Sequence, residues 1–264
     1  MGLTPLWRPQ LRESIILVFV SNAPSFYLTI TLVSSRYTYT VAFQSLAHGA
    51  RRLERFSSKI NHGKQILVID GASLIGQAVI ELAVLSGAVV FATGQAENHQ
   101  YISTLGATPL DNDINKWLPI LRGKMDVVID TFTSQIFQYE AVEKSLKKNG
   151  RLVCIGTPMR MKNLKHGSTS LSDFCDQIRA QTSLIFLSQE GATYYDLFCN
   201  IDNYSKRLMK DLEYVLSLLA CQFISPRIKK YVTIDEVAYG LVPIEPGAAG
   251  TIICEPWRKK GPPR

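Results

Sequence analysis

The stretch that decides the fold is DGASLIGQAVIELA, Asp70 to Ala83. It stands between two apolar runs, ILVI and AVVFAT, which predict strands over 64–70 and 88–93. Apolar residues within the stretch recur at helical spacing: Ile75, Val79, Leu82 and Ala83. The sequence therefore predicts a strand, a tight turn, a helix over 74–86 and a second strand.

Strands and helices continue to alternate after this unit. We expect helices at 97–105, 113–121, 134–148, 205–222 and from Asp235, and strands at 125–130, 151–156, 183–187, 228–234 and 251–254. The helix at 134–148 is expected to end at Asn149-Gly150, which is a common stop signal. Residues 158–180 are polar and basic, which predicts a loop. This alternation indicates an α/β fold with a doubly wound parallel sheet, the Rossmann fold.

The turn before the first of these helices has the pattern G-x-S-x-x-G: Gly71, Ala72, Ser73, Leu74, Ile75 and Gly76. A dinucleotide fingerprint has a glycine in all three places, for the tight turn, the approach of pyrophosphate and the packing of helix on strand. Ser73 replaces the second glycine, and the Asp70 carboxylate opposes a phosphate unless its side chain points away. Two interpretations stay open. Either the free amides of the helix N-terminus still bind a dinucleotide, or this is a Rossmann-like turn that no longer binds one.

The end of the second strand selects the cofactor, because an acid there binds the ribose of NAD. Thr93, Gly94 and Gln95 occupy this place, so the sequence disfavours NAD and permits NADP. No clear phosphate-binding Arg or Lys follows directly. Asn98 and His99 offer weaker contacts.

Composition indicates a globular chain with a packed core. Among 264 residues, 46% are hydrophobic and 19% are charged, which argues against global disorder. The net charge of +7 is spread over short basic clusters without interleaved aromatics, so we expect no nucleic-acid binding. The five cysteines are widely spaced, which argues against a disulfide framework and a compact zinc site. Cys154 and Cys254 lie in apolar runs and are expected to be core thiols.

The first residues of the chain have two interpretations. Ser14 to Ser35 carries no charge and has nearly the length of a membrane span, but a Ser-Asn-Ala-Pro-Ser segment interrupts it. It is either a strand-like or irregular segment or a targeting or anchor segment. We expect a cytoplasmic protein, with a secretory or membrane-anchor signal left open.

Several motifs in order resemble one family. The segments GKQILVIDGASLIGQAVIELAVLSGAVVFAT, LGATPLD, MDVVIDTF, NGRLVCIGTP and GTIICEPW are similar to the cofactor half of the medium-chain dehydrogenases. The similarity is greatest to the quinone oxidoreductase and zinc-type alcohol dehydrogenase-like branch. It covers about Tyr39 to Trp257 and suggests three parts: an N-terminal segment 1–38, a Rossmann domain 39–257 and a basic tail 258–264.

The resemblance implies an NADP(H)-dependent transfer of hydride to or from a quinone, enone or carbonyl. It implies that the turn at Gly71 to Gly76 binds pyrophosphate. Gln95 and Asn98 match positions where relatives often carry Ser and Lys for the 2′-phosphate. The strand ends that match the ribose and nicotinamide side carry Thr131, Gly156 and Thr157. A homodimer through the region from Tyr231 to Ile253 is also implied.

The chain departs from this family in ways that leave its activity open. Residues 1–38 are too few for the family's N-terminal catalytic domain, and the zinc ligands have no counterpart, so zinc-independent chemistry is expected. No catalytic residue can be named. A short-chain dehydrogenase is disfavoured, because no Tyr has a Lys four residues later. A serine hydrolase is disfavoured, because Gly71 to Ile75 lacks the last glycine of G-x-S-x-G. A non-catalytic Rossmann protein that senses cofactor or serves as an interaction module stays the alternative.

Overall fold

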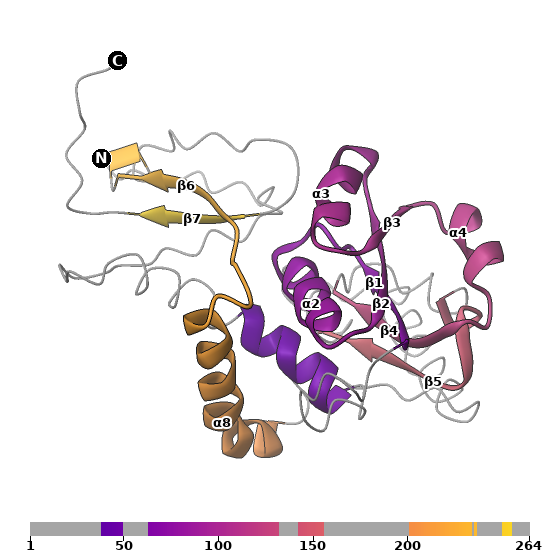
Figure 1. The fold of residues 1–264 in the computed structure, drawn as a ribbon, viewed down its shortest axis with the longest axis horizontal. Helices are drawn as coiled ribbons and strands as arrows, with labels where there is room; N and C mark the ends of the chain where they lie inside the picture. The colour runs from indigo at the N-terminus through magenta and orange to yellow at the C-terminus, as the bar shows by residue number, and fades with distance from the viewer. Residues whose placement is uncertain are drawn as a thin grey trace, which may run out of the picture.

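The centre of the molecule is a five-stranded parallel sheet. The computed structural model describes residues 38–49, 63–131, 142–155, 201–233, 235–236 and 250–254. The strands are β1 (Gln65–Ile69), β2 (Val89–Gly94), β3 (Thr108–Asp111), β4 (Met125–Asp130) and β5 (Leu146–Cys154). Their order is β3-β2-β1-β4-β5, and all described pairs are parallel (Figure 1). The predicted α/β fold with a doubly wound sheet is confirmed, and the strand order reverses between β1 and β4.

Helices connect these strands and begin at polar caps. The helices of the sheet region are α2 (Leu74–Leu85), the 3-10 turn η2 (Ala96–Asn98), α3 (His99–Thr104) and α4 (Ile114–Leu121). Ser73 caps α2, and the Asp113 carboxylate caps α4 by accepting from the Asn115 N–H at 3.0 Å. Such oxygens satisfy N–H groups that the first helical turn leaves without partners. The predicted helices at 74–86 and 113–121 are thereby confirmed to within one residue.

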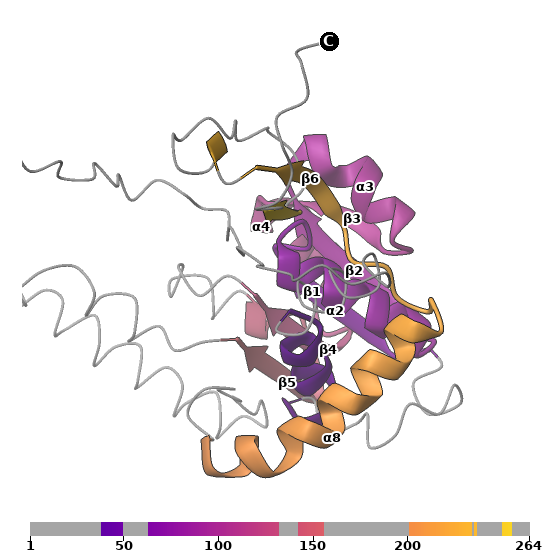
Figure 2. The same cartoon turned by 90° about the vertical axis from the view of Figure 1, so that its left-hand side faces the viewer.

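Alternate residues of each strand face opposite layers of the molecule. On β1, Ile66 and Val68 join the larger apolar cluster, whereas Leu67 joins a second cluster on the other face. Trp117 and Leu121 of α4 are buried in that second cluster. The first face is covered by α2, by the helical residues 38–44 and by α8 (Ile201–Ala220) (Figure 2).

The first helical segment and α8 come from distant parts of the sequence and pack together. Residues 38–44 are α-helical and continue into a short π-helix, η1 (Ser45–Gly49). Gln44 Nε2 donates to Asp211 Oδ2 at 2.9 Å, and the rings of Phe43 and Tyr214 lie 5.2 Å apart. The predicted apolar face of α8 is confirmed for Leu212, Val215, Leu216 and Leu219, while the side chain of Leu208 lies outside the described residues.

The last two described strands form a separate sheet. β6 (Ile228–Val232) and β7 (Thr251–Cys254) pair in parallel with each other. Both strands were predicted, and the helical residues 235–236 follow a capping box in which Thr233 and Glu236 exchange hydrogen bonds. The homodimer expected through Tyr231 to Ile253 stays a prediction.

Two sequence predictions differ from the structure. The helix at 134–148 is wrong at its C-terminal end, because β5 begins at Leu146 and continues through Gly150. Asn149 has φ 68°, and the pairing of β5 with β4 shifts register in this region, so Asn149-Gly150 forms an irregularity inside a strand. The second difference is β3, which was not predicted; it is a half-exposed edge strand that contains Pro109.

Some predictions fall on residues that the structure does not describe. These are the N-terminal segment up to residue 37, the loop at 158–180, the strand at 183–187, and Gly156 and Thr157. Cys154 is buried as expected, and Cys254 lies in β7. Across the described ranges, no helix has both the length and the apolarity needed to cross a membrane.

Candidate functional site

The turn between β1 and α2 is packed so closely that two glycines are required. A Cβ on Gly76 would lie 2.3 Å from the Asp70 carbonyl oxygen and 2.8 Å from Gly71 Cα. A Cβ on Gly71 would lie 2.7 Å from the Cβ of Ala92 on β2. The first and third glycines of the fingerprint are therefore fixed by steric contact, as the sequence pattern predicts.

Ser73 stands in the second glycine position and does not strain the backbone. Its φ of −68° and ψ of 161° are extended values that any residue adopts. Its hydroxyl donates to the Asp70 carbonyl oxygen at 2.8 Å and accepts from the Gly76 N–H at 3.1 Å. The side chain therefore caps α2 and uses one of the amides at the helix N-terminus.

The same hydroxyl reaches the next strand of the sheet. Ser73 Oγ lies 3.1 Å from Thr131 Oγ1, and the Thr131 hydroxyl donates to the Ile69 carbonyl oxygen at 2.7 Å. Thr131 directly follows β4, so the contact joins the carboxyl ends of β1 and β4. This is the point at which the strand order reverses, where doubly wound sheets bind their ligands.

Two amides at the N-terminus of α2 remain available. Within the part of the chain that the structure describes, the N–H groups of Leu74 and Ile75 have no hydrogen-bond partner. Ala72 is held on the other side of the turn, because its carbonyl oxygen accepts from Gln77 Nε2 at 2.7 Å. Free amides and the helix dipole favour an anion. This donor set and the two glycines fit a pyrophosphate, and Ser73 removes one donor from it.

The end of β2 serves mainly to hold this turn. The buried Thr93 accepts from the Asp70 N–H through its hydroxyl at 3.0 Å and from the Gly71 N–H through its carbonyl at 2.8 Å. A Cβ on Gly94 would lie 2.7 Å from the Ile102 side chain, so this position too is tightly packed. Thr93 thus holds the turn with both its hydroxyl and its carbonyl oxygen, and Gly94 contributes through close packing.

The two predicted 2′-phosphate residues have different surroundings. Gln95 is exposed at the start of η2, whereas Asn98 is 7% exposed. Gln95 is therefore open to a ligand, and Asn98 is largely enclosed by protein. His99 directs Nε2 to the Gly94 carbonyl oxygen at 3.1 Å, so its ring lies at the end of β2.

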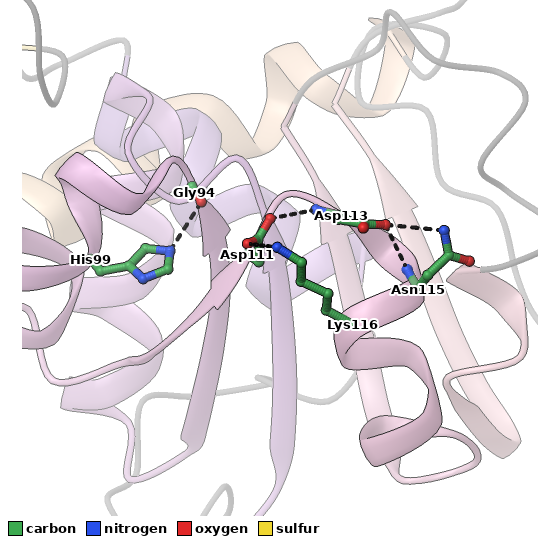
Figure 3. A network of polar contacts seen from close by, with 6 residues as sticks. All are labelled: Gly94, His99, Asp111, Asp113, Asn115 and Lys116. Carbon is green, nitrogen blue, oxygen red and sulfur yellow. Dashed lines mark hydrogen bonds and ion pairs between the residues drawn. The ribbon is translucent and has the colours of Figure 1, made fainter.

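An ion pair at the end of β3 was missed from the sequence. Asp111 is the register partner of Gly94. Its carboxylate accepts from Lys116 Nζ at 2.6 Å and from the Asp113 N–H at 2.9 Å (Figure 3). The hydrogen bond from Lys116 lowers the pKa of Asp111, and Asp111 raises the pKa of Lys116. The strand order of a doubly wound sheet could have predicted this position, because it places β3 beside β2 and so brings the end of β3 next to the end of β2.

The structure brings most of the predicted site residues to one edge of the sheet. The turn residues and Thr93 are joined to one another by hydrogen bonds and packing, and Thr131 joins them through Ser73. Gln95 and Asn98 follow the adjacent strand. Gly156 and Thr157 lie outside the described residues, and the effect of the Asp70 charge stays a prediction. In the described ranges, no three His, Cys, Asp or Glu residues gather as metal ligands would.

Comparisons with known proteins show what the fold resembles. No family model matches the chain, and no curated protein does. An alcohol dehydrogenase superfamily protein from Novosphingobium aromaticivorans is 22% identical over 77% of this chain and 55% of that one, with a TM-score of 0.52. The quinone oxidoreductase from Coxiella burnetii is 18% identical over 77% and 54%, with a TM-score of 0.54.

A third solved structure agrees with these two. A probable oxidoreductase from Mycobacterium abscessus is 16% identical over 85% of this chain and 62% of that one, with a TM-score of 0.55. These structures, each less than 25% identical to the chain, confirm the Rossmann fold that the resemblance implied. The chain spans just over half the length of the first two structures.

Proposed function

We propose that this chain binds a nicotinamide dinucleotide and takes part in an oxidoreductase reaction. The observation that carries the proposal is the turn at the reversal point of the sheet. There, Gly71 and Gly76 are required by packing, and the N–H groups of Leu74 and Ile75 are free among the described residues. The fold of known oxidoreductases supports the same assignment.

The proposed roles follow from the position of each residue. The Leu74 and Ile75 amides would hold the pyrophosphate, and Thr131 stands on the side where the resemblance puts ribose and nicotinamide. A bound nicotinamide supplies hydride chemistry. The protein's part is to position the cofactor against a quinone, an enone or another carbonyl compound and to exclude water.

NADP(H) is the cofactor that we propose. The exposed residue after β2 is Gln95, which carries no charge to repel a 2′-phosphate. An acid in that place would instead favour the free 2′-hydroxyl of NAD. We also propose that the reaction is independent of zinc.

A second function has one specific observation in its favour. The Ser73 hydroxyl accepts from the Gly76 N–H, which is among the amides that an anion would use. If this hydrogen bond prevents tight binding of a cofactor, the chain is a non-catalytic Rossmann protein. The carboxyl edge of its sheet then serves to sense a cofactor weakly or to bind another protein. The two candidates differ in whether Ser73 prevents a dinucleotide from binding at the turn.

A binding titration separates these candidates. NADPH and NADH are titrated into the purified chain while cofactor fluorescence is recorded, for the wild type and for Ser73→Gly. Ser217→Gly is the matched control, because Ser217 is an exposed helical serine whose hydroxyl also bonds a carbonyl oxygen three residues back.

Each result has a distinct meaning. Tight NADPH binding by the wild type supports the oxidoreductase and justifies an activity screen with quinones and enones. Cofactor binding by Ser73→Gly but not by the wild type means that Ser73 prevents binding at the turn, which supports the non-catalytic candidate. No binding by either protein overturns the cofactor site itself.

A further inference from the structure

The ion pair between Asp111 and Lys116 carries an inference about nucleotide specificity. We propose that Lys116, held in place by Asp111, recognises the 2′-phosphate of a phosphorylated adenosine and makes the site prefer it to the unphosphorylated form. The inference rests on the proposed function, because it assumes that a nucleotide binds at this edge of the sheet. It assigns the specificity to a residue of α4, beyond the segment that follows β2.

The register of the sheet places this pair where the adenosine ribose would lie. Asp111 and Gly94 are partners in the parallel pairing of β3 with β2, so the two strands end side by side. In a doubly wound fold the ribose meets the carboxyl end of the second strand. Lys116 reaches that end because its ammonium lies 2.6 Å from the Asp111 carboxylate (Figure 3).

Local hydrogen bonds fix the approach of Lys116. Asp111 accepts from the Asp113 N–H at 2.9 Å, and Asp113 in turn accepts from both the backbone and the side-chain amide of Asn115. These bonds hold the connection between β3 and the first turn of α4. They fix the direction from which the lysine side chain leaves the helix.

The charges at this edge indicate that a phosphate would need Lys116 in order to bind beside Asp111. Asp111 alone would repel a phosphate, because its carboxylate stands beside the end of β2. Lys116 offsets that charge and has three donors, of which Asp111 needs one. The Lys116 side chain is 63% exposed, so its other donors are accessible to a ligand. The pKa of Lys116 is raised by Asp111, which keeps the ammonium charged.

Other candidates for this role are weaker. Lys116 is the only Lys or Arg from residue 65 to residue 121. Gln95 is neutral, and Asn98 is buried. Arg227 comes from a later part of the chain and stacks on the ring of Tyr101 at 4.2 Å from its centre. The cation that this half of the sheet offers from its own strands and helices is therefore that of Lys116.

The test uses two fragments that differ only in the presence of the 2′-phosphate. The probes are 2′,5′-ADP and 5′-AMP, titrated by calorimetry into the full chain and its variants. Lys116→Met is expected to weaken binding of 2′,5′-ADP about tenfold, which is the value of one charge-assisted contact, and to leave 5′-AMP unchanged. Lys124→Met is the control, because Lys124 is exposed directly before β4, at the amino end of the strands and away from the carboxyl ends that would hold the ligand.

A second background separates direct contact from charge neutralisation. In Asp111→Asn, direct contact predicts that Lys116→Met still weakens 2′,5′-ADP; no further weakening there overturns the direct contact. A wild type that prefers 2′,5′-ADP, together with a Lys116→Met variant that keeps this preference, overturns the inference and leaves the proposed function standing. A wild type that binds neither fragment overturns both. Circular dichroism confirms that each variant is folded.

Discussion

The turn after β1 and the edge formed by β2 and β3 are held together by different forces. In the turn, a missing Cβ decides the structure, because Gly76 lies against the Asp70 carbonyl at a distance that no side chain tolerates. At the edge, β2 and β3 are joined by their parallel pairing, and an exposed ion pair between Asp111 and Lys116 links the end of β3 to α4. Close packing therefore determines the structure of the turn that would hold the pyrophosphate. The adjacent residues that would contact the ribose are instead characterised by their charges.

This difference gives the two regions different tolerances. Packing contacts between backbone atoms cannot adjust, so substitutions in the turn affect folding. Exposed charges are hydrated and screened, so substitutions at the edge affect ligand preference more than stability. The following four experiments test this contrast, from the largest expected effect to the smallest.

Gly76→Ala is expected to lower the free energy of unfolding by about 3 kcal/mol, because the new Cβ overlaps backbone atoms that cannot move away. Urea unfolding followed by circular dichroism measures the change. The control is Gly123→Ala, where nothing lies within 4 Å of the added Cβ and the cost is that of a positive φ. That control is expected to lose about 1 kcal/mol. Equal losses in both variants would remove the contrast.

A half-buried carboxyl on α2, that of Glu81, gives the second effect, which depends on pH. Tyr39 donates to Glu81 of α2, and Tyr101 lies nearby. Burial raises the pKa of Glu81 above its ordinary value of 4.5. The folded state therefore holds this proton more tightly than the unfolded chain does. The resulting stability is complete below 4.5 and is lost as the pH rises through the raised value.

Unfolding measured across acidic and neutral pH tests this effect. The wild type is expected to lose stability with rising pH relative to Glu81→Gln, which does not titrate. Glu97→Gln, at an exposed position, serves as the control and is expected to follow the wild type. Parallel profiles for the wild type and Glu81→Gln would show that Glu81 is not the cause.

Ser73→Ala is the third experiment and removes the cap of α2 without adding volume. We expect a loss of about 1 kcal/mol, typical of a missing N-cap hydroxyl. Ser217→Ala removes an exposed helical hydroxyl and is expected to change stability by less than about 0.5 kcal/mol. Thermal unfolding of both variants measures the difference. A Ser73→Ala variant as stable as Ser217→Ala would show that the cap and the Thr131 contact contribute nothing.

Asp111→Asn at the exposed edge is expected to have the smallest effect on stability. Lys116 lowers the pKa of Asp111, so its contribution is present above the ordinary value of 3.8 and disappears as the pH falls through the lowered value. High salt is expected to reduce that contribution, because the pair is exposed. Unfolding at low and high salt measures it. A loss as large as that of Ser73→Ala would contradict the assignment of this edge to ligand preference.

The same contrast explains what the sequence predicted. Gly71 and Gly76 could be identified because their packing partners belong to one strand-turn-helix unit, whose pattern is local. The link from Lys116 to the end of β2 depends on the register of β3, and β3 was not predicted because it is short, half-exposed and contains Pro109. The bonds of the Ser73 hydroxyl were also missed, since a residue type alone does not give the direction of a side chain.

Asn149-Gly150 shows a further limit of local patterns. The pair is a common helix stop, but here it lies inside β5, where the pairing with β4 shifts register. Asn149 adopts the positive φ that such an irregularity needs. Asn149 has the positive φ that a helix end can also have, but the pairing with β4 determines that a strand contains it.

The contact between Gln44 and Asp211 has a consequence for synthesis on the ribosome. The two residues are 167 positions apart, and the core against which residues 38–44 pack also contains Val215, Leu218 and Leu219 of α8. A nascent chain that has exposed only β1 to β5 therefore lacks the contacts of this core with α8 until α8 emerges. Contacts of such long range close late and slow folding. During that interval the growing chain presents a surface suited to a chaperone.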